Sequence, residues 1–277
     1  METTVAVTGA TGNVGGRVAR HLADAGVRQR LLVRDPSRAP ELPNATVAQS
    51  AYDDAAATQA ALEGIVTVFM VSAAESVDRV QQHRTFIDAA AAAGVANVVY
   101  TSLCGAAPDA TFTLARDHWA TEEHIKQASM RWTFLRDNLY ADFLPKTVSD
   151  GMIRGPAGDG RAAVVAIDDV ADVASAVLLN PSPHAGNTYY LTGPQSLSLD
   201  EVAAIISEAS GSAVTYHPET LDEAYESRRH YGAPDWMVDA WVSTYTAVAA
   251  GEYAQVTDDV QRITGHPPRS LKQVLAS

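Results

Sequence analysis

The sequence predicts an α/β protein built on a doubly wound parallel sheet of the Rossmann type. A short apolar strand at residues 5–8 runs into a glycine-rich segment, and a helical pattern begins directly after it. Further apolar stretches have the length and composition of strands, at 30–34, 45–48, 66–71, 97–101 and 132–136. Segments of helical composition separate them, as crossovers between parallel strands require. The expected strand order is 3-2-1-4-5-6.

The segment TGATGNVG, Thr8–Gly15, has the spacing of a loop that holds the pyrophosphate of a dinucleotide. Gly9 permits the tight turn, Gly12 leaves bare backbone for the phosphates, and Gly15 lets the helix pack closely on its strand. The helix N-terminus adds unpaired N–H groups and a positive dipole end, which attract an anion. The alternative is a strand-to-helix turn without a ligand. The order of strand, loop and helix favours the dinucleotide site.

The second half of the chain predicts a smaller, mostly helical lobe. Its first expected elements are a glycine-rich loop, a strand, a helix, a second strand and a helix capped by Ser198, at 151–160, 162–167, 168–179, 188–192 and 199–210. We expect a dinucleotide-binding Rossmann domain at 1–150 and a substrate-covering lobe at 151–277. Because no linker composition separates them, the lobe is expected to be woven onto the first domain.

Composition limits the classes of function. The formal charge of −13 over 277 residues disfavours binding to nucleic acid or an anionic membrane. No apolar run approaches the roughly 18 residues of a membrane span, and no export signal precedes the first strand, so a cytoplasmic location is expected. The single cysteine, Cys104, and the eight histidines show no metal-ligand spacing, so no metal site is predicted. The sequence does not specify an oligomeric state.

The end of the second strand indicates which dinucleotide is bound. NAD-binding folds place an acidic residue there to accept hydrogen bonds from the ribose hydroxyls. Here Val33 is followed by Arg34, and Arg38 comes four residues later. A guanidinium binds a 2′-phosphate through two hydrogen bonds, which favours NADP(H) over NAD(H). The alternative is a solvated basic edge with Asp35 as a partial counter-charge.

Several stretches carry a family resemblance: TGATGNVG at 8–15, VRDPSR at 33–38, QQHRTFIDAAAAAGV at 81–95, YTSL at 100–103, the pairs DH at 117–118 and TE at 121–122, FLRDNLY at 134–140, and GPAGDGR at 155–161. They resemble the NmrA-like branch of atypical short-chain dehydrogenases/reductases, in particular the bacterial type-2 NADPH:quinone oxidoreductases. The resemblance covers nearly the whole chain. It implies an NAD(P)-binding oxidoreductase whose cofactor contacts come from Gly9, Thr11, Gly12, Asn13, Val14, Arg34, Arg38, Val71 and Ser72.

One loop departs from that pattern. The similar reductases tend to have QADY after the third strand, with the aspartate recognising adenine, whereas this chain has Ser50-Ala51-Tyr52 after Gln49. Ala51 cannot accept that hydrogen bond. Asp53 or Asp54 is the alternative acceptor, unless backbone contacts and stacking alone hold the adenine.

The usual catalytic pair of short-chain dehydrogenases, Tyr-x-x-x-Lys, is absent, because none of the ten tyrosines has a lysine four residues later. In its place, after the fifth strand, stand His118 and Glu122, which share a helix face. The carboxylate could orient the imidazole as a proton donor or as a contact of the nicotinamide ribose. The alternative is an ordinary ion pair on the helix surface.

Polar residues also end the fifth and sixth strands, at the sheet edge where open α/β folds bind their ligands. Thr101 and Ser102 close the fifth strand and are expected to reach the nicotinamide or the substrate. Asn138 and Tyr140 follow the sixth strand, and Tyr140 is expected to contact the substrate. The alternative for Tyr140 is an aromatic ring packed beneath the C-terminal lobe.

Together these features predict an NADPH-dependent reductase that transfers hydride to a quinone or a similar conjugated small molecule. Such an acceptor needs little activation, so the missing Tyr-Lys pair is tolerable. The candidate catalytic residues are His118, Asn138 and Tyr140. Two alternatives stay open: a non-catalytic NADP(H)-binding redox sensor of the NmrA type, and a biosynthetic tailoring reductase.

Overall fold

The computed structural model describes residues 4–276. The chain forms two compact units, each assembled from three stretches that are separate in the sequence. The first unit contains the stretch ending at 102 together with 117–136 and 167–189, and the second contains 103–116, 137–166 and the stretch beginning at 190. This division differs from the single boundary expected at residue 150, because the chain alternates between the units.

A seven-stranded sheet organises the first unit. Its strands are β1 (Val5–Thr8), β2 (Gln29–Val33), β3 (Ala45–Gln49), β4 (Thr67–Met70), β5 (Asn97–Leu103), β6 (Arg131–Asp137) and β10 (Asn187–Leu191). The observed order, β10-β6-β5-β4-β1-β2-β3, contains the predicted order of the first six strands and adds β10 beside β6. Strands β1 to β5 pair in parallel, so their carboxyl ends share one edge.

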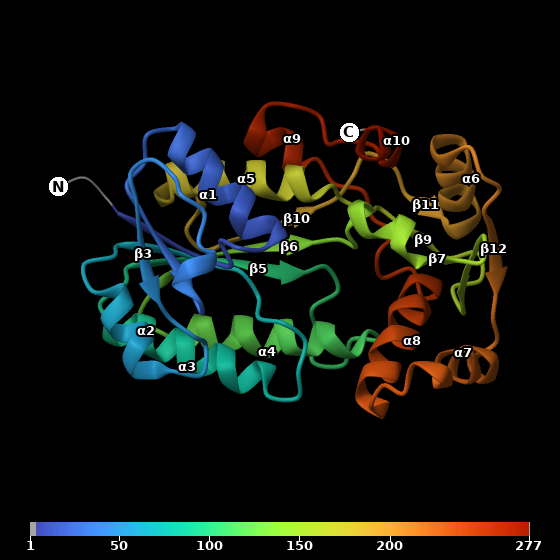
Figure 1. The fold of residues 1–277 in the computed structure, drawn as a ribbon, viewed down its shortest axis with the longest axis horizontal. Helices are drawn as coiled ribbons and strands as arrows, with labels where there is room; N and C mark the ends of the chain where they lie inside the picture. The colour runs from blue at the N-terminus through green and yellow to red at the C-terminus, as the bar shows by residue number, and fades with distance from the viewer. Residues whose placement is uncertain (1–3, 277) are drawn as a thin grey trace. The chain divides into compact units, whose positions relative to one another are not determined.

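Helices cover both faces of this sheet (Figure 1). Helices α1 (Asn13–Asp24) and α5 (Ile167–Leu179) lie on one face, and α2 (Ala55–Leu62), α3 (Arg79–Ala92) and α4 (Thr113–Gln127) lie on the other. The core on the second face joins alternate strand residues such as Val68 and Val98 to helix residues such as Leu62, Ile87 and Ile125. The 3₁₀ turns η1 (Pro36–Arg38) and η3 (Ser182–His184) also belong to this unit. The predicted doubly wound architecture is therefore confirmed.

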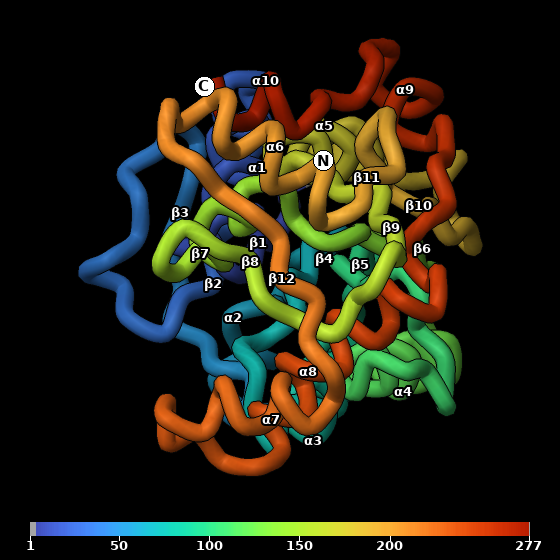
Figure 2. Tube along the Cα trace, turned by 90° about the vertical axis from the view of Figure 1, so that its right-hand side faces the viewer, coloured from blue at the N-terminus to red at the C-terminus, as the bar shows by residue number. Residues whose placement is uncertain are grey.

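The second unit contains two small sheets and most of the C-terminal helices. In one sheet β8 (Met152–Gly155) lies between β7 (Val148–Ser149) and β12 (Thr215–Pro218), as Figure 2 shows. In the other, β9 (Arg161–Ala162) pairs with β11 (Leu197–Ser198). The remaining elements are η2 (Ala141–Thr147), α6 (Leu199–Ser210), α7 (Leu221–Arg228), η4 (Arg229–Tyr231), α8 (Asp235–Ala249), α9 (Asp259–Thr264) and α10 (Leu271–Leu275).

Two expected elements of this region have different outcomes. The helix from Leu199 begins as predicted, because Ser198 and Glu201 cap it reciprocally. The strand expected at 162–167 is shorter, since it ends at Ala162. Beyond that point the backbone bonds to single residues of other segments: the Ala163 N–H donates to Tyr253 O (2.8 Å) and the Val165 N–H to Leu139 O (2.9 Å). None of the helices in residues 4–276 combines the length and apolar character needed to cross a membrane.

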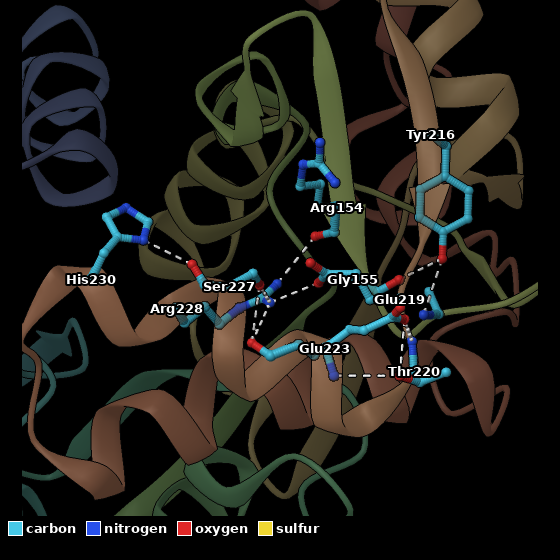
Figure 3. Close-up of polar contacts among 11 residues, drawn as sticks. Arg154, Gly155, Tyr216, Glu219, Thr220, Glu223, Ser227, Arg228 and His230 are labelled. Atoms are coloured by element: carbon cyan, nitrogen blue, oxygen red, sulfur yellow. Dashed lines mark hydrogen bonds and ion pairs between the residues drawn. The ribbon is translucent and has the colours of Figure 1, made fainter.

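A buried arginine stabilises the second unit at the end of β8 (Figure 3). Arg228 Nη1 donates to Glu219 Oε2 at 2.8 Å, and its Nη2 donates to Arg154 O at 3.1 Å. The guanidinium lies 5.3 Å from the ring centroid of Tyr245. Gly155 packs against the same ring, since a Cβ there would come within 2.4 Å of Tyr245. The charge of Arg228 is thus fully engaged inside the unit.

Candidate active site

The loop between β1 and α1 has the shape of a phosphate cradle. Gly9 has a φ of +64°, and the Gly12 N–H closes the turn by donating to Gly9 O at 2.8 Å. A Cβ at Gly15 would come within 2.4 Å of Gly9 O, so α1 packs directly on the loop. A Cβ at Gly9 would lie 3.2 Å from the side chain of Val71. The tight turn predicted at Gly9 and the close packing predicted at Gly15 are present, and the phosphate contact of Gly12 stays a prediction.

The N-terminus of α1 is suited to an anion. Gly12 is the N-cap residue, no side chain caps the helix, and its first turn contains no acidic residue. Gly9, Thr11, Gly12 and Asn13 are exposed, whereas Val14 is buried. Val14 is therefore suited to contact a ligand through its backbone and not through its side chain. Uncapped N–H groups at a helix start bind phosphate well, so the loop fits the pyrophosphate of a dinucleotide.

The two predicted arginines follow β2 and are exposed. Asp35, between them, accepts hydrogen bonds from the Ser37 hydroxyl (2.7 Å) and the Ser37 N–H (3.0 Å). These bonds lower the pKa of Asp35, which serves as the N-cap of η1. Neither Arg34 nor Arg38 forms an ion pair with another described residue. Arg38 makes a small contribution to the lowered pKa of Asp35, as in the alternative of a solvated basic edge, so binding of a 2′-phosphate by the two guanidinium groups stays a prediction.

Tyr52 joins the ends of β1 and β4, a role that the sequence analysis missed. Its hydroxyl donates to Val71 O at 2.5 Å and lies 2.7 Å from Thr8 Oγ1. The Thr8 oxygen in turn accepts the Val71 N–H at 2.8 Å. Burial raises the pKa of Tyr52, so the phenol stays neutral. The pattern at 49–52 pointed to Ala51 as the departure from the family, but the residue of this loop that contacts Thr8 and Val71 is Tyr52.

The acidic residues beside Ala51 differ in their availability. Asp54 accepts the Ala57 N–H at 2.9 Å and caps α2. Asp53 is exposed. Of the two predicted substitutes for an adenine acceptor, Asp54 is therefore the one already engaged as a helix cap.

The loop after β4 is held by side chains from β5 and α3. The Ser72 N–H donates to Thr101 Oγ1 at 2.9 Å, and the Ala73 N–H donates to His83 Nε2 at 2.8 Å. Because His83 Nε2 accepts, its Nδ1 carries the proton and donates to Thr121 Oγ1 at 2.8 Å. Burial, with a smaller contribution from nearby Arg79, lowers the pKa of His83 to about 3. His83 is therefore a neutral support for this loop, which the sequence analysis did not identify.

His118 is buried between a guanidinium and a phenol. Arg79 Nη2 lies 3.1 Å from His118 Nε2, and the Tyr100 hydroxyl lies 3.0 Å from His118 Nδ1. A guanidinium can only donate, so Nε2 accepts and the Nδ1–H donates to the Tyr100 oxygen. Burial and Arg79 hold the pKa of His118 well below its usual value. Both ring nitrogens of the neutral imidazole are thus engaged within the first unit.

The predicted contact between His118 and Glu122 is wrong. Glu122 accepts the Ser102 hydroxyl at 2.6 Å and the Arg136 guanidinium at 2.6 and 2.9 Å, and it is buried. The two residues share a face of α4, but side chains from the strands and from α3 supply their partners. The surface ion pair, offered as the alternative, is also wrong. The Ser102 hydroxyl is aimed at Glu122, and its predicted contact with the nicotinamide stays a prediction.

In the second unit, Asn138 has a structural contact at each end of its amide. Its Oδ1 accepts the Leu139 N–H at 2.8 Å, and its Nδ2 donates to Tyr253 O at 3.0 Å. The side chain is buried. These bonds tie the end of β6 to the loop after α8, so a catalytic role for this amide stays a prediction.

Tyr140 has a buried carboxyl partner that the sequence analysis missed. Its hydroxyl lies 2.6 Å from Asp137 Oδ2, and its half-buried ring meets Phe143 edge-to-face at 5.7 Å. Asp137 is the last residue of β6 and is 2% exposed. The available sequence signal was an acidic residue at the carboxyl end of a strand, separated by one residue from the buried pair Phe134 and Leu135.

A glycine turn leading to an uncapped helix, at the carboxyl edge of a parallel sheet, defines the first unit as a dinucleotide-binding α/β unit. The model of the NmrA-like family matches residues 1–234, and the chain belongs to that family. The predicted family and the Rossmann-like fold are therefore confirmed.

Three relatives show what this chain is similar to. It is 33% identical to the NAD(P)H azoreductase of Xenophilus azovorans, over 97% of this chain and 96% of the relative. It is 31% identical to quinone oxidoreductase 2 of Escherichia coli, over 97% and 96%. The NADPH complex of the Escherichia coli NADPH-dependent quinone oxidoreductase matches with a TM-score of 0.90 and 30% identity, over 98% of both chains. The Citrobacter triphenylmethane reductase complexed with NADP(H) matches with a TM-score of 0.87 and 30% identity, over 98% of this chain and 99% of that chain.

These relatives are oxidoreductases named for NAD(P)H or solved with NADPH or NADP(H). At the level of the family, the predicted oxidoreductase class and the predicted NADP(H) cofactor are thus confirmed.

Proposed function

We propose that this protein transfers hydride from NADPH to a quinone or a similar conjugated small molecule. The observation that carries the proposal is the exposed glycine cradle before α1, followed after β2 by two arginines that form no ion pair within residues 4–276. The similar proteins are named for quinones, azo compounds and triphenylmethane dyes. Each of these is a conjugated system that accepts a hydride, which supports the same acceptor class here.

The residues of the first unit bind and orient the cofactor in this proposal. The backbone from Gly9 to Val14 holds the pyrophosphate, and Arg34 and Arg38 bind the 2′-phosphate. The loop at Val71 and Ser72 passes beneath the cofactor, fixed by Thr101 and His83. The nicotinamide supplies a hydride from its C4 position when the cofactor is bound.

His118 acts as a positioning residue in this proposal. Its two hydrogen bonds hold the Arg79 guanidinium and the Tyr100 phenol beside the loop after β4. A neutral imidazole with both nitrogens engaged is poorly suited to give a proton directly. A quinone accepts hydride readily, so the reaction depends on acid catalysis only modestly.

Steady-state oxidation of NADPH in the presence of a panel of quinones and azo dyes tests the function. We expect turnover with at least one acceptor and a primary isotope effect on single-turnover hydride transfer from NADPH deuterated at the transferred C4 position. If the protein binds NADPH but no acceptor oxidises it, the redox-sensor alternative is favoured instead. Turnover without any isotope effect on the oxidation step would contradict direct hydride transfer.

A further inference from the structure

A cavity of about 550 Å³ lies in the first unit, at the amino ends of its strands. The first residue of each of β1, β4, β5 and β6 lines it: Val5, Thr67, Asn97 and Arg131. The glycine loop instead follows the carboxyl end of β1. The cavity and the phosphate cradle therefore lie at opposite edges of one sheet, and the cavity has the volume of a small-molecule site.

The charged groups that line the cavity have one sign. They are Arg28 and Arg131, and the other described lining residues are uncharged. This local balance contrasts with the formal charge of −13 on the whole chain. Arg131 is exposed and forms no ion pair within residues 4–276. An anion that binds Arg131 therefore displaces no carboxylate, and two hydrogen bonds to the guanidinium fix its orientation.

Apolar side chains that line the same cavity are exposed as well. Val66, directly before β4, and Leu179, the last residue of α5, are 42% and 53% exposed. Removal of such aliphatic surface from water is favourable. An inorganic anion leaves this surface in contact with water, whereas the body of an organic acid covers it. The lining therefore favours a ligand that combines an anionic group with an apolar body.

We propose that this cavity is a second ligand site, which binds an organic anion: a carboxylate or sulfonate on an aliphatic or aromatic body. The Arg131 guanidinium holds the anionic group, and Val66 and Leu179 contact the apolar body. The inference does not depend on the proposed reductase function. Because the length of β1 separates this cavity from the glycine loop, the organic anion and the dinucleotide bind at the same time.

The probe for this site is 8-anilinonaphthalene-1-sulfonate, an aromatic sulfonate whose fluorescence rises in an apolar environment. It is titrated into the protein in the presence of saturating NADP⁺, which fills the phosphate cradle. We expect one probe molecule to bind per chain. Arg131→Glu and Leu179→Asp should each weaken its binding at least about fivefold, since both place a carboxylate beside the probe. Arg20→Glu, which replaces an exposed arginine of α1 outside the cavity, should leave the affinity unchanged.

Competition distinguishes the classes of anion. Decanoate should displace the probe, whereas inorganic phosphate at the same concentration should not, because phosphate has no apolar body. Circular dichroism checks that all three variants are folded. Loss of probe binding on addition of NADP⁺, equal displacement by phosphate and decanoate, or wild-type affinity in Arg131→Glu or Leu179→Asp would overturn the proposal. None of these results depends on NADPH oxidation, so the reductase function is tested separately by its own assay.

Discussion

The guanidinium Nη2 of Arg79 lies 3.1 Å from Nε2 of His118, and this contact fixes the imidazole as a hydrogen-bond acceptor. The opposite nitrogen then donates to Tyr100. The residue that the sequence offered as an acid is, in the structure, a neutral link between α3 and β5. The guanidinium of Arg79, on α3, makes His118 Nε2 an acceptor and helps to keep the imidazole neutral.

Removal of this link should slow turnover only moderately. We expect His118→Ala to lower kcat by no more than about 100-fold, the lower limit of typical acid catalysis. His118→Gln, whose side-chain oxygen can still accept from Arg79, should recover most of that loss. Because the pKa of His118 is held well below its usual value, neither variant should remove a kinetic transition between pH 5.5 and 7.5. A wild-type transition in that range that disappears in His118→Gln would contradict this role.

The two arginines after β2 should determine cofactor preference. We expect NADPH to bind at least tenfold more tightly than NADH, equivalent to about 1.4 kcal/mol. Arg34→Ala and Arg38→Ala should each weaken NADPH binding and leave NADH binding unchanged, as measured by fluorescence titration. Arg229→Ala, which removes an exposed arginine of the second unit, is the control. Equal dissociation constants for NADPH and NADH in wild type would rule out this assignment.

Two glycines of the same loop should differ in the effect of a valine. Gly12→Val should abolish NADPH binding in a folded protein, since the added side chain occupies the pyrophosphate space and its Cβ meets only Gly9 O, at 3.2 Å. Gly15→Val should disrupt folding, because its Cβ would lie 2.4 Å from Gly9 O and 2.5 Å from Thr8 O. Circular dichroism and NADPH titration of both variants distinguish the two effects. Normal NADPH binding by Gly12→Val would show that the loop is only a turn.

The raised pKa of Asp137 makes stability depend on pH. The pKa of Asp137 is near 4 in the unfolded chain and about 8 in the folded one, because burial disfavours the carboxylate. Between these two pH values the folded state binds the proton more tightly than the unfolded state. The resulting stabilisation is present at low pH and is lost as the pH rises through 8. Asp137→Asn should therefore gain stability relative to wild type between pH 5 and pH 9. We expect the difference in Tm to grow by at least about 3 °C, the shift for roughly 1 kcal/mol in a chain of this size. A constant difference in Tm, as expected for the control Asp159→Asn at an exposed carboxylate of the same unit, would show that Asp137 has an ordinary pKa.

The Arg228–Glu219 pair should be far more important for stability than a neighbouring surface pair. The side chains of Arg228 and Glu219 are 10% and 3% exposed, whereas those of Arg229 and Glu226 are 76% and 67% exposed. Arg228→Ala leaves a buried carboxylate without its cation and should cost about 3–5 kcal/mol of unfolding free energy. Arg229→Ala should change it by no more than about 0.5 kcal/mol. Urea unfolding measures both, and similar losses in the two variants would contradict the argument.

Local patterns predicted the fold well. The apolar strands, the glycine loop and the Ser198 cap depend on neighbours within a few residues, and each is found where the sequence placed it. The strand order also followed, because parallel strands joined by helices allow few arrangements. The extent of the strand after Gly160 did not follow, since its backbone partners belong to distant segments.

The side-chain partners of the site depend on tertiary contacts that spacing cannot specify. His118 and Glu122 are four residues apart on α4, yet Arg79 and Arg136 supply their charged partners. Asp137 received no attention in the sequence analysis because an acidic residue after a strand has no distinctive spacing. Its significance comes from burial and from the Tyr140 hydroxyl. Spacing thus located the relevant helix and strand ends but not the hydrogen bonds between them.

The hydrogen bonds around Tyr52 have a consequence for the thermodynamics of cofactor binding. Thr8, Tyr52 and Val71 bond to one another from three segments of the first unit, and the two residues after Val71 are held in the same way. The loops on both sides of the expected cofactor path are therefore ordered by the protein itself. Binding then loses little backbone entropy, so most of the free energy of the phosphate contacts is retained as affinity.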